Sequence, residues 1–402
     1  MPHQRSPLDL RRDHEFSCLE RPLNAADASP WQPPMPLKGI YRILVCRPNH
    51  RLGNTLLLTP LIAELEHRFK GAEIDILSEG QIAAEVFPTF FSVKNIYCLP
   101  RRGFKHPWAF LSLLLRIRKT HYDLIVDPCL GSNFSRAMTK FLYGRYKLGF
   151  DDRLNGSGLT HAVPRSVAMR HMAKRAINLV RWINEHTDGD GAEFPSMDIR
   201  LTASEREQGK TLLAEILPDF DDSVVRHRVG IFANATGAKR YPQDWWREFI
   251  ATLVQGLPHA SIVEFLPMHG QSMLDGAWPA YYSSDIRRMG SVMAAADLMV
   301  SADCGVMHLA VASGVPTVGL FSITDSAVYE PYGHDSRALQ TGDLSARDSA
   351  EWIVDAYAEV LDRSSVVGPI GAHDQDPARP RAAMSVQKQT SCAPEVLPVH
   401  PG

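Results

Sequence analysis

The chain has 402 residues, of which 45% are hydrophobic and 22% are charged, so its composition is that of a globular protein large enough for two domains. Its formal net charge of −2 gives no overall attraction to nucleic acid, and any anion must be bound by a local cluster of cations. No run approaches the roughly 18 apolar residues of a membrane span, so we expect a protein that is not integral to a membrane.

The two ends of the chain are rich in proline. Residues 1–38 hold seven of the 28 prolines and residues 364–402 hold six, without hydrophobic periodicity, and we predict that both segments are disordered. The first segment shows no signal-peptide pattern, and the six cysteines form no C-x-x-C pair. We therefore expect reduced thiols and a cytoplasmic location.

The first half of the chain alternates between strands and helices. The predicted strands are 42–47, 73–77, 93–99, 122–127 and 146–150, and the predicted helices are 55–70, 107–119, 132–142 and 169–185. This alternation predicts a parallel sheet with helices on both faces. We assign residues 39–186 to an N-terminal Rossmann-like domain.

A second alternating series follows a polar linker at residues 187–200. Its predicted helices are 204–217, 243–254, 292–296 and 346–361, and its predicted strands are 229–234, 261–266, 298–301 and 317–321. We assign residues 201–363 to a C-terminal domain. The chain is thus predicted to fold into two Rossmann-like domains that face each other across a cleft.

The stretch from Ser301 to Leu320 predicts an anion site. A strand leads into a turn at Asp303-Cys304-Gly305 and then into a helix, whose free N–H groups and dipole favour a diphosphate. His308 lies one helical turn further, where its ring can reach the same anion. The alternative interpretation is an ordinary helix–strand connection with no ligand.

Two other loops repeat this arrangement. Arg47–Pro60 contains Gly53 followed by Asn54 at a predicted helix start, where Asn54 is also a good N-cap residue. Asn234–Trp246 places Lys239 and Arg240 between a strand and a helix, where the cations suit a phosphate. A solvated pair of charges is the alternative for the second loop.

Together these stretches resemble glycosyltransferase family 9, the heptosyltransferases that extend the inner core of lipopolysaccharide. The family pattern R-L-G-D-x-L-x-x-T-P is met at Arg51–Pro60 except for its aspartate, and D-x-G-x-x-H-L-A is met in full at Asp303–Ala310. The K-x-W/Y-P pattern is met by Lys239, Tyr241 and Pro242. A weaker pattern, His followed four residues later by Arg, is met by His171 and Arg175, and the resemblance spans about residues 41–361.

The resemblance implies an α/β protein of the GT-B fold that transfers a sugar with inversion and without a metal. It implies no cofactor other than the nucleotide-sugar donor, and the donor of this family is ADP-heptose. It implies that the partners are this donor and a lipid-linked glycan acceptor. The donor-binding residues implied are Lys239, Asp303, Cys304, Gly305 and His308. The acceptor-binding residues implied are Arg51, Gly53, Arg136, His171 and Arg175, with Lys174 on the same helix face. A solvated basic face is the alternative for that helix.

One departure from the family pattern concerns the chemistry. The family places a catalytic aspartate where this chain has Asn54, and an amide cannot accept the proton of the acceptor hydroxyl. Asn54 could orient that hydroxyl while Asp127, at a strand tip, or His50, in the same loop, takes the proton. The chain could also have lost catalysis and bind only a sugar nucleotide or glycolipid, or it could use a hexose or N-acetylhexosamine donor.

The segment Arg101–Lys119 places an apolar run between clusters of cations. Such a segment can rest on an anionic membrane surface, where a lipid acceptor would lie. The alternative is a core-facing helix with charged ends, which we favour from the sequence because the run is apolar nearly all round.

Other chemistries are disfavoured. No G-x-G-x-x-G follows the first strand, as a dinucleotide-dependent oxidoreductase would require. No His, Cys and carboxylate set has the spacing of a metal site, and no G-x-S-x-G elbow is present.

Overall fold

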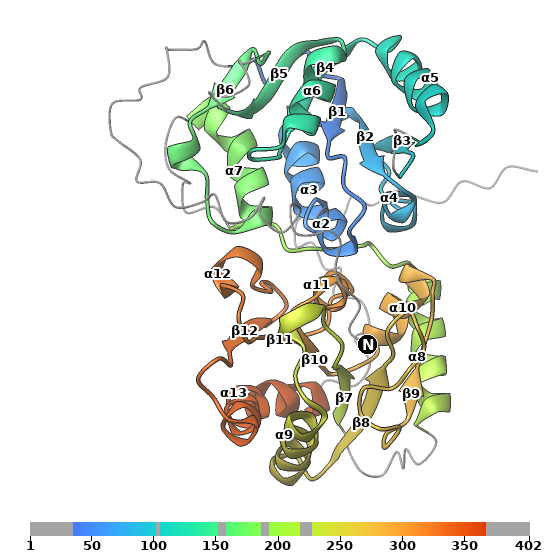
Figure 1. Cartoon of the computed structure of the whole chain (residues 1–402), viewed down its shortest axis with the longest axis vertical. Helices are drawn as coiled ribbons and strands as arrows, with labels where there is room; N and C mark the ends of the chain where they lie inside the picture. The colour runs from blue at the N-terminus through green and yellow to red at the C-terminus, as the bar shows by residue number, and fades with distance from the viewer. Residues whose placement is uncertain (1–34, 102–104, 152–157, 186–192, 218–226, 367–402) are drawn as a thin grey trace, which may run out of the picture.

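The computed structural model describes residues 35–101, 105–151, 158–185, 193–217 and 227–366. These residues form two α/β domains, one above the other in Figure 1, each built on a parallel sheet of six described strands. Parallel strands are joined by helices that cover the sheet, as the alternating pattern predicts.

The N-terminal sheet is doubly wound around β1. In spatial order its described strands are β3 (Val93–Leu99), β2 (Glu73–Glu79), β1 (Arg42–Cys46), β4 (Tyr122–Asp127), β5 (Gly144–Phe150) and β6 (His161–Val163). Residues Ile43–Cys46 are fully buried between β2 and β4, which explains their continuous apolar run. The winding reverses at β1, and ligands of open α/β sheets bind beside the carboxyl ends at such a point.

The described helices of this domain lie between these strands or after them. They are α2 (Leu52–Leu56), α3 (Thr59–Arg68), α4 (Ile82–Val86), α5 (Pro107–Arg118), α6 (Asn133–Phe141), the 3-10 helix η4 (Arg165–Val167) and α7 (Met172–Glu185).

The C-terminal sheet repeats the doubly wound plan around β10 and β7. In spatial order its described strands are β12 (Arg337–Gln340), β11 (Thr317–Phe321), β10 (Leu298–Ala302), β7 (His227–Phe232), β8 (Ala260–Phe265) and β9 (Ala280–Tyr281). The described helices are α8 (Ala203–Ile216), η5 (Gly237–Lys239), α9 (Gln243–Gly256), α10 (Ile286–Met293), α11 (Gly305–Ala312), α12 (Ser326–Tyr329) and α13 (Ala346–Val366). Helices α9 and α13 lie side by side at the end of this domain remote from the other one (Figure 1).

The single helix predicted for residues 55–70 is two helices. Helix α2 already ends at Leu56, and α3 begins at Thr59 with Pro60 in its first turn. Proline has no N–H to continue the first helix but is accommodated at the start of the second. The hydroxyl of Thr59 donates to the carbonyl of Leu56 at 2.8 Å and stabilises the break.

Other element boundaries also differ from the prediction. Helix α10 begins at Ile286 rather than at residue 292, because the Asp285 carboxylate accepts a hydrogen bond from the N–H of Arg288 and caps the helix. Helix α7 begins at Met172, three residues later than expected. The short elements α4, β6, β9, α12 and β12 were not predicted.

The predicted linker is a packed strap where the structure describes it. Residues 186–192 lie outside the described residues, but Met197 and Ile199 are fully buried. The N–H of Asp198 donates to Thr59 Oγ1 of the N-terminal domain at 3.2 Å, and the N–H of Ile199 donates to the carbonyl of Ala312 in the C-terminal domain at 2.9 Å. The strap therefore bonds to both domains.

The predicted disordered ends fall mostly on residues 1–34 and 367–402, outside the described residues. Met35, which we had included in the N-terminal extension, is buried against the core, so the folded chain begins earlier than predicted. Within the described ranges, no helix combines the length and the hydropathy needed to cross a membrane.

Candidate active site

The two predicted glycine turns meet at the contact between the domains. Helix α2, at the lower edge of the upper domain in Figure 1, faces α11 at the upper edge of the lower domain. A Cβ atom on Gly53 would lie 3.2 Å from the Cα of Gly305 and 3.0 Å from Cδ2 of His308. A Cβ atom on Gly305 would lie 2.9 Å from the backbone nitrogen of Gly53, so only glycine fits this approach.

The C-terminal side of this contact carries an ion pair. Lys239 follows β7 and Asp303 follows β10, and the carboxyl ends of these two paired strands bring the residues together. Lys239 Nζ lies 2.6 Å from Asp303 Oδ2, and the side chain of Asp303 is 7% exposed while that of Lys239 is 31% exposed. Asp303 thus holds a cation whose outer side remains open to an anion.

His308 is the buried polar group of this side. It is 3% exposed, and its Nδ1 has no hydrogen-bond partner among the described residues. Burial, with a smaller contribution from the nearby His171, lowers the pKa of His308 to about 4. A neutral imidazole in this position can donate one N–H to an anion.

Cys304 is the N-cap of α11, and burial raises the pKa of its thiol, so the sulfur stays neutral beside the ion pair. The five implied donor-binding residues, Lys239, Asp303, Cys304, Gly305 and His308, are therefore adjacent at one end of the C-terminal sheet. Their role in binding stays a prediction.

Asn54 does not cap its helix. The N-cap of α2 is Arg51, and Asn54 is the third residue of the helix, half-buried next to the glycine contact. The capping interpretation of Asn54 is therefore wrong.

His50 is paired with a carboxylate that the sequence analysis missed. His50 Nδ1 lies 3.0 Å from Oε2 of Glu79, and the two side chains are 33% and 26% exposed. Glu79 is the last residue of β2, the strand beside β1, so the two residues meet at the same sheet edge. The predicted strand ends at Leu77, two residues too early. Because side chains at strand ends were considered as candidate site residues, the correct strand end would have identified Glu79.

Asp127 and Arg136 form a buried ion pair. Asp127 is fully buried, accepts hydrogen bonds from the Ser135 hydroxyl at 2.7 Å and the Cys129 N–H at 3.2 Å, and pairs with Arg136 Nε at 3.1 Å. Arg136 also donates to the carbonyl of Phe150 at 2.8 Å. Both side chains are buried and bonded to each other, which disfavours them as a base and an acceptor ligand, and the roles assigned to Asp127 and Arg136 stay predictions.

His171 and Lys174 join the two domains. His171 Nε2 donates to the carbonyl of Glu330 at 2.9 Å, and Lys174 Nζ lies 3.3 Å from Oε1 of the same residue. Arg170 pairs with Asp325 of the segment leading into α12. The helix face predicted to be basic and to meet an acceptor instead contacts the C-terminal domain.

Arg175 is also engaged within its own domain. Its Nε donates to the carbonyl of Met169 at 2.7 Å and its Nη2 donates to the carbonyl of Arg170 at 2.9 Å, which fastens the start of α7. These bonds place His171 in the domain contact and Arg175 at the helix start, and the acceptor roles of both residues stay predictions.

A cationic cluster that adds Arg47 to two predicted residues, Arg51 and Arg175, lies next to these residues. Arg47 and Arg175 act electrostatically on the phenol of Tyr329, and Arg51 does so more weakly, although burial still raises the pKa of Tyr329 overall. The Nε of Arg47 is buried and unpartnered among the described residues. Arg47 directly follows β1, and this position at the end of a strand could have identified it from the sequence as a candidate site residue.

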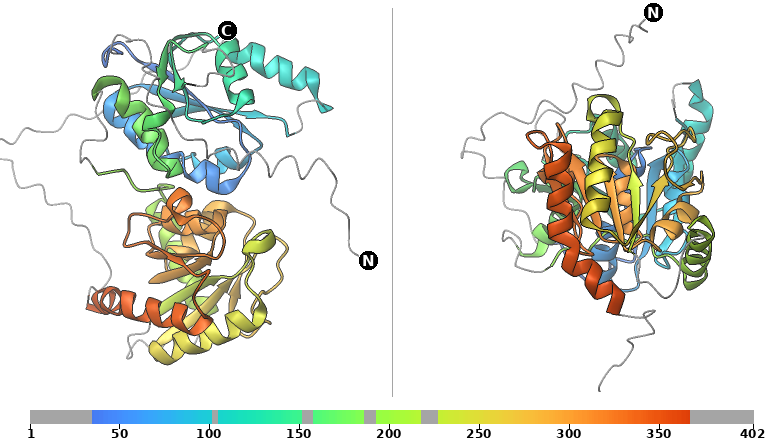
Figure 2. Two further views of the ribbon diagram at one scale, coloured as in Figure 1. Left: turned by 60° about the vertical axis from the view of Figure 1, so that its left-hand side comes forward. Right: turned by 90° about the horizontal axis from the view of Figure 1, so that it is seen from below.

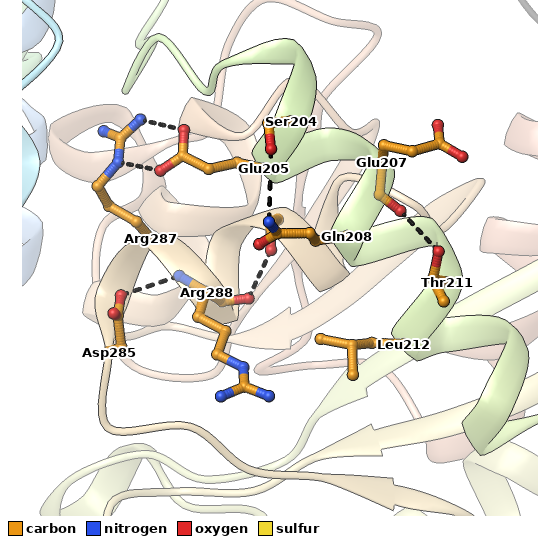
Figure 3. Close-up of a pocket in the computed structure, with 10 residues that line it drawn as sticks. Ser204, Glu205, Glu207, Gln208, Thr211, Leu212, Asp285, Arg287 and Arg288 are labelled. Atoms are coloured by element: carbon orange, nitrogen blue, oxygen red, sulfur yellow. Dashed lines mark hydrogen bonds and ion pairs between the residues drawn. The ribbon is translucent and has the colours of Figure 1, made fainter.

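The described structure also has a hollow on the outer side of the C-terminal domain, between α8 and α10 (Figure 3). Its main charges are already paired: Arg287 binds Glu205 through two nitrogens and also donates to the carbonyl of Ile199 at 2.9 Å. These bonds hold the strap to α10, and the hollow contains none of the predicted site residues. Among the described residues, no group of three or more His, Cys, Asp or Glu side chains is arranged to hold a metal ion.

Comparison with known proteins supports the predicted resemblance. The model of glycosyltransferase family 9 (heptosyltransferase) matches residues 284–352, which include Asp303–Ala310, and the resemblance is confirmed on this segment. No curated protein sequence matches the chain.

Solved structures share the fold of the chain. A family 9 glycosyltransferase from Veillonella parvula superposes with a TM-score of 0.68 at 16% identity, over 82% of this chain and 99% of that one. Escherichia coli ADP-heptose lps heptosyltransferase II superposes with a TM-score of 0.60 at 17% identity, over 81% of this chain and 99% of that one. E. coli heptosyltransferase WaaC, solved with ADP, gives 0.57 at 18% identity, over 78% and 99%. The predicted GT-B fold is thereby confirmed.

Enlarging Gly305 should force the domains apart. In Gly305→Ala the new methyl group meets the Gly53 nitrogen at 2.9 Å, and such overpacking typically costs about 1–3 kcal/mol. We expect a larger radius of gyration by small-angle scattering and a lower free energy of unfolding, with a greater effect in Gly305→Val. Unchanged values in both variants would contradict the close contact.

His171 should make the domain contact sensitive to acid. Burial lowers its pKa to about 4 in the folded protein, whereas an unfolded chain has a His pKa near 6.5. As the pH falls below about 6.5 the unfolded state binds the proton first, so the free energy of unfolding should fall by on the order of 2 kcal/mol between pH 7.5 and 5 from this group. In urea titrations the free energy of unfolding should depend less steeply on pH in His171→Gln than in the wild type. An equal pH dependence in both proteins would refute this linkage.

Proposed function

From the family 9 match over residues 284–352 and the GT-B fold, we propose that this protein is a glycosyltransferase that moves a sugar from a nucleotide diphosphate to a hydroxyl group. In this proposal the donor binds to the C-terminal domain and the acceptor to the N-terminal domain. Transfer takes place beside the contact of Gly53 with Gly305. The fold alone would not support this choice, because one fold serves many functions.

The observation that carries the proposal is the polar arrangement at the start of α11. His308 Nδ1 is buried without a described partner, next to a lysine that Asp303 holds at 2.6 Å. A buried polar atom without a hydrogen bond is costly, so this nitrogen favours a bound hydrogen-bond partner. A diphosphate oxygen would satisfy the imidazole N–H while Lys239 and the dipole of α11 stabilise its negative charge.

The proposed donor is an ADP-linked heptose. The support is the family 9 match, together with the similar fold of E. coli proteins described with ADP and as an ADP-heptose heptosyltransferase. A nucleotide of a hexose or an N-acetylhexosamine is the alternative that a binding experiment must separate.

The proposed base is His50, oriented by Glu79. When Nδ1–H donates to the Glu79 carboxylate, Nε2 carries the lone pair and can accept the proton of an acceptor hydroxyl. Both side chains are partly exposed, in contrast to Asp127, so they can meet a bound molecule. Asn54, in the same loop region, would orient the hydroxyl through its amide.

The reaction that follows is a single displacement. The acceptor oxygen forms a bond to the anomeric carbon while the bond from that carbon to the diphosphate oxygen breaks, and the diphosphate leaves with the electron pair. The proton passes to His50, and Lys239 and His308 stabilise the charge on the leaving group. Attack on the face opposite to the leaving group gives an inverted product, and no step requires a metal.

The proposed acceptor is an anionic glycan linked to a lipid, and the proposed location is the cytoplasm. The support for an anionic acceptor is the cationic cluster of Arg47 and Arg51, in which Arg47 Nε is buried without a described partner. The sugar core of a lipopolysaccharide has this chemistry, as the family 9 resemblance implies.

The second candidate is a protein that binds the sugar nucleotide or glycolipid but does not turn it over. Asn54 favours this candidate, because the family pattern places its catalytic aspartate there. Binding and turnover measured on the same preparation separate the two candidates.

Nucleotide diphosphates should bind at Lys239 and His308. Thermal-shift screening against ADP- and UDP-linked sugars should give selective stabilisation by one donor, because binding to the folded state raises its stability. Lys239→Ala and His308→Gln should each weaken that binding at least about tenfold, by removing a hydrogen bond to a charged group.

Arg240→Ala is the matched control for this experiment. Arg240 is the adjacent loop cation, but its guanidinium faces the carbonyl of Ala235 and the side chain of Asn234, both at 3.3 Å. Equal affinity in the Lys239, His308 and Arg240 variants would reject the donor site.

Removing the base should slow transfer without weakening donor binding. His50→Ala should lower kcat by about 10²–10⁴-fold with the donor affinity unchanged, and added imidazole should restore part of the rate. Glu79→Gln should lower kcat less than His50→Ala does, with KM unchanged, because Glu79 only orients the imidazole of His50.

Two results would overturn this assignment. Full turnover by both variants would exclude His50 as the base. Donor binding without turnover in the wild type, followed by a large gain of activity in Asn54→Asp, would favour the binding-only candidate instead.

A further inference from the structure

Helix α5 exposes an apolar ridge that the proposed reaction does not use. Trp108 is 81% exposed, and Leu111 and Leu115 are 42% and 47% exposed. In this helix only Leu114 and Ile117 are buried. The core-facing interpretation that we favoured from the sequence is therefore wrong for most of the helix.

The three exposed side chains lie along one face. Their spacing of three and four residues places them one above the other on an α-helix, so they form a continuous ridge rather than scattered contacts. Large apolar side chains that are exposed in a group mark an interaction surface, whereas single exposed apolar residues are common and need no explanation. The helix stands at the edge of the N-terminal domain, away from the C-terminal domain (Figures 1 and 2).

The ridge is accompanied by positive charge. Lys105 before the helix, Arg116 within it and Lys119 at its C-cap are exposed, and residues 105–120 contain no Asp or Glu. A helix with an apolar face and flanking cations lies in the plane of an anionic membrane surface, with the apolar side chains among the lipid headgroups. A tryptophan is well suited to that boundary.

The ridge is connected to the candidate active site. Helix α5 follows β3, and the carbonyl of Leu99 at the end of that strand accepts the N–H of Gly80 at 3.0 Å. A Cβ atom on Gly80 would lie 3.6 Å from the Arg101 side chain and 3.8 Å from the Cβ of His50. The chain entering α5 therefore starts at the sheet edge that carries His50 and Glu79.

We propose that α5 docks the N-terminal domain on an anionic lipid bilayer, with Trp108, Leu111 and Leu115 inserted at the interface and Arg116 and Lys119 against the headgroups. Docking through this helix brings the sheet edge with His50 to the membrane surface, where a lipid-linked molecule is presented. The absence of acidic side chains from residues 105–120 favours this occupant over a second copy of the chain, whose own ridge would bring like charges together.

The test is flotation of the full chain with vesicles. The wild type should float with phosphatidylcholine vesicles that contain phosphatidylglycerol and should stay unbound with phosphatidylcholine alone. Arg116→Gln/Lys119→Gln should weaken partitioning about 25-fold, taking about fivefold for each cation lost near an anionic surface. Trp108→Ser/Leu111→Ser/Leu115→Ser should weaken it at least tenfold, and thermal unfolding should confirm that both variants fold.

Met268→Ser is the matched control, because Met268 is 86% exposed on the C-terminal domain and has no role in the proposal. It should bind vesicles as the wild type does. Binding by both α5 variants equal to that of the wild type would overturn the proposal, as would equal flotation of the wild type with neutral vesicles. A dimer in solution that the α5 substitutions dissociate, without vesicle binding by the wild type, would show a second copy to be the occupant and would also overturn it.

Discussion

The backbone approach of Gly53 to Gly305 is the constraint on which the arrangement of the two domains depends. Each glycine lies in the first turn of a helix, and a Cβ on Gly305 would fall 2.9 Å from the other backbone. Because no side chain separates them, both helix starts and the polar residues around them are brought to one place. The contacts of His171 and Lys174 with Glu330 and the buried strap at Met197 hold this geometry from two other directions.

Exposure distinguishes two carboxylates that stand at strand ends of the N-terminal domain. The Asp127 carboxylate is buried and its oxygens are bonded to Ser135 and Arg136. These bonds join β4 to α6. Glu79 has the same position at the end of a strand, but it and His50 remain partly open to solvent. Both carboxylates stand at a strand tip, and accessibility decides between them as candidates for a catalytic role.

Much of the architecture was predictable because it rests on local patterns. The continuous apolar runs at β1 and β10 indicated buried parallel strands, and the turn at Asp303–Gly305 indicated the start of α11. The predictions failed where a single residue changes a boundary, as Pro60 and Asp285 do. The guanidinium of Arg136, whose charge suggested a ligand, lies 3.1 Å from the buried carboxylate of Asp127, a pairing that periodicity does not reveal.

By itself the sequence determined the α/β class, the two-domain plan and the pattern at Asp303–Ala310, which lies within the segment 284–352 that matches family 9, because these follow from periodicity and from residues adjacent in the chain. Only the tertiary structure decided that His50 meets Glu79, that Gly53 touches Gly305 and that the face of α5 with Trp108 points outward. The physical reason is the same in each case. These outcomes depend on the rotation of an element about its axis and on distances between segments far apart in the chain, which periodicity leaves open.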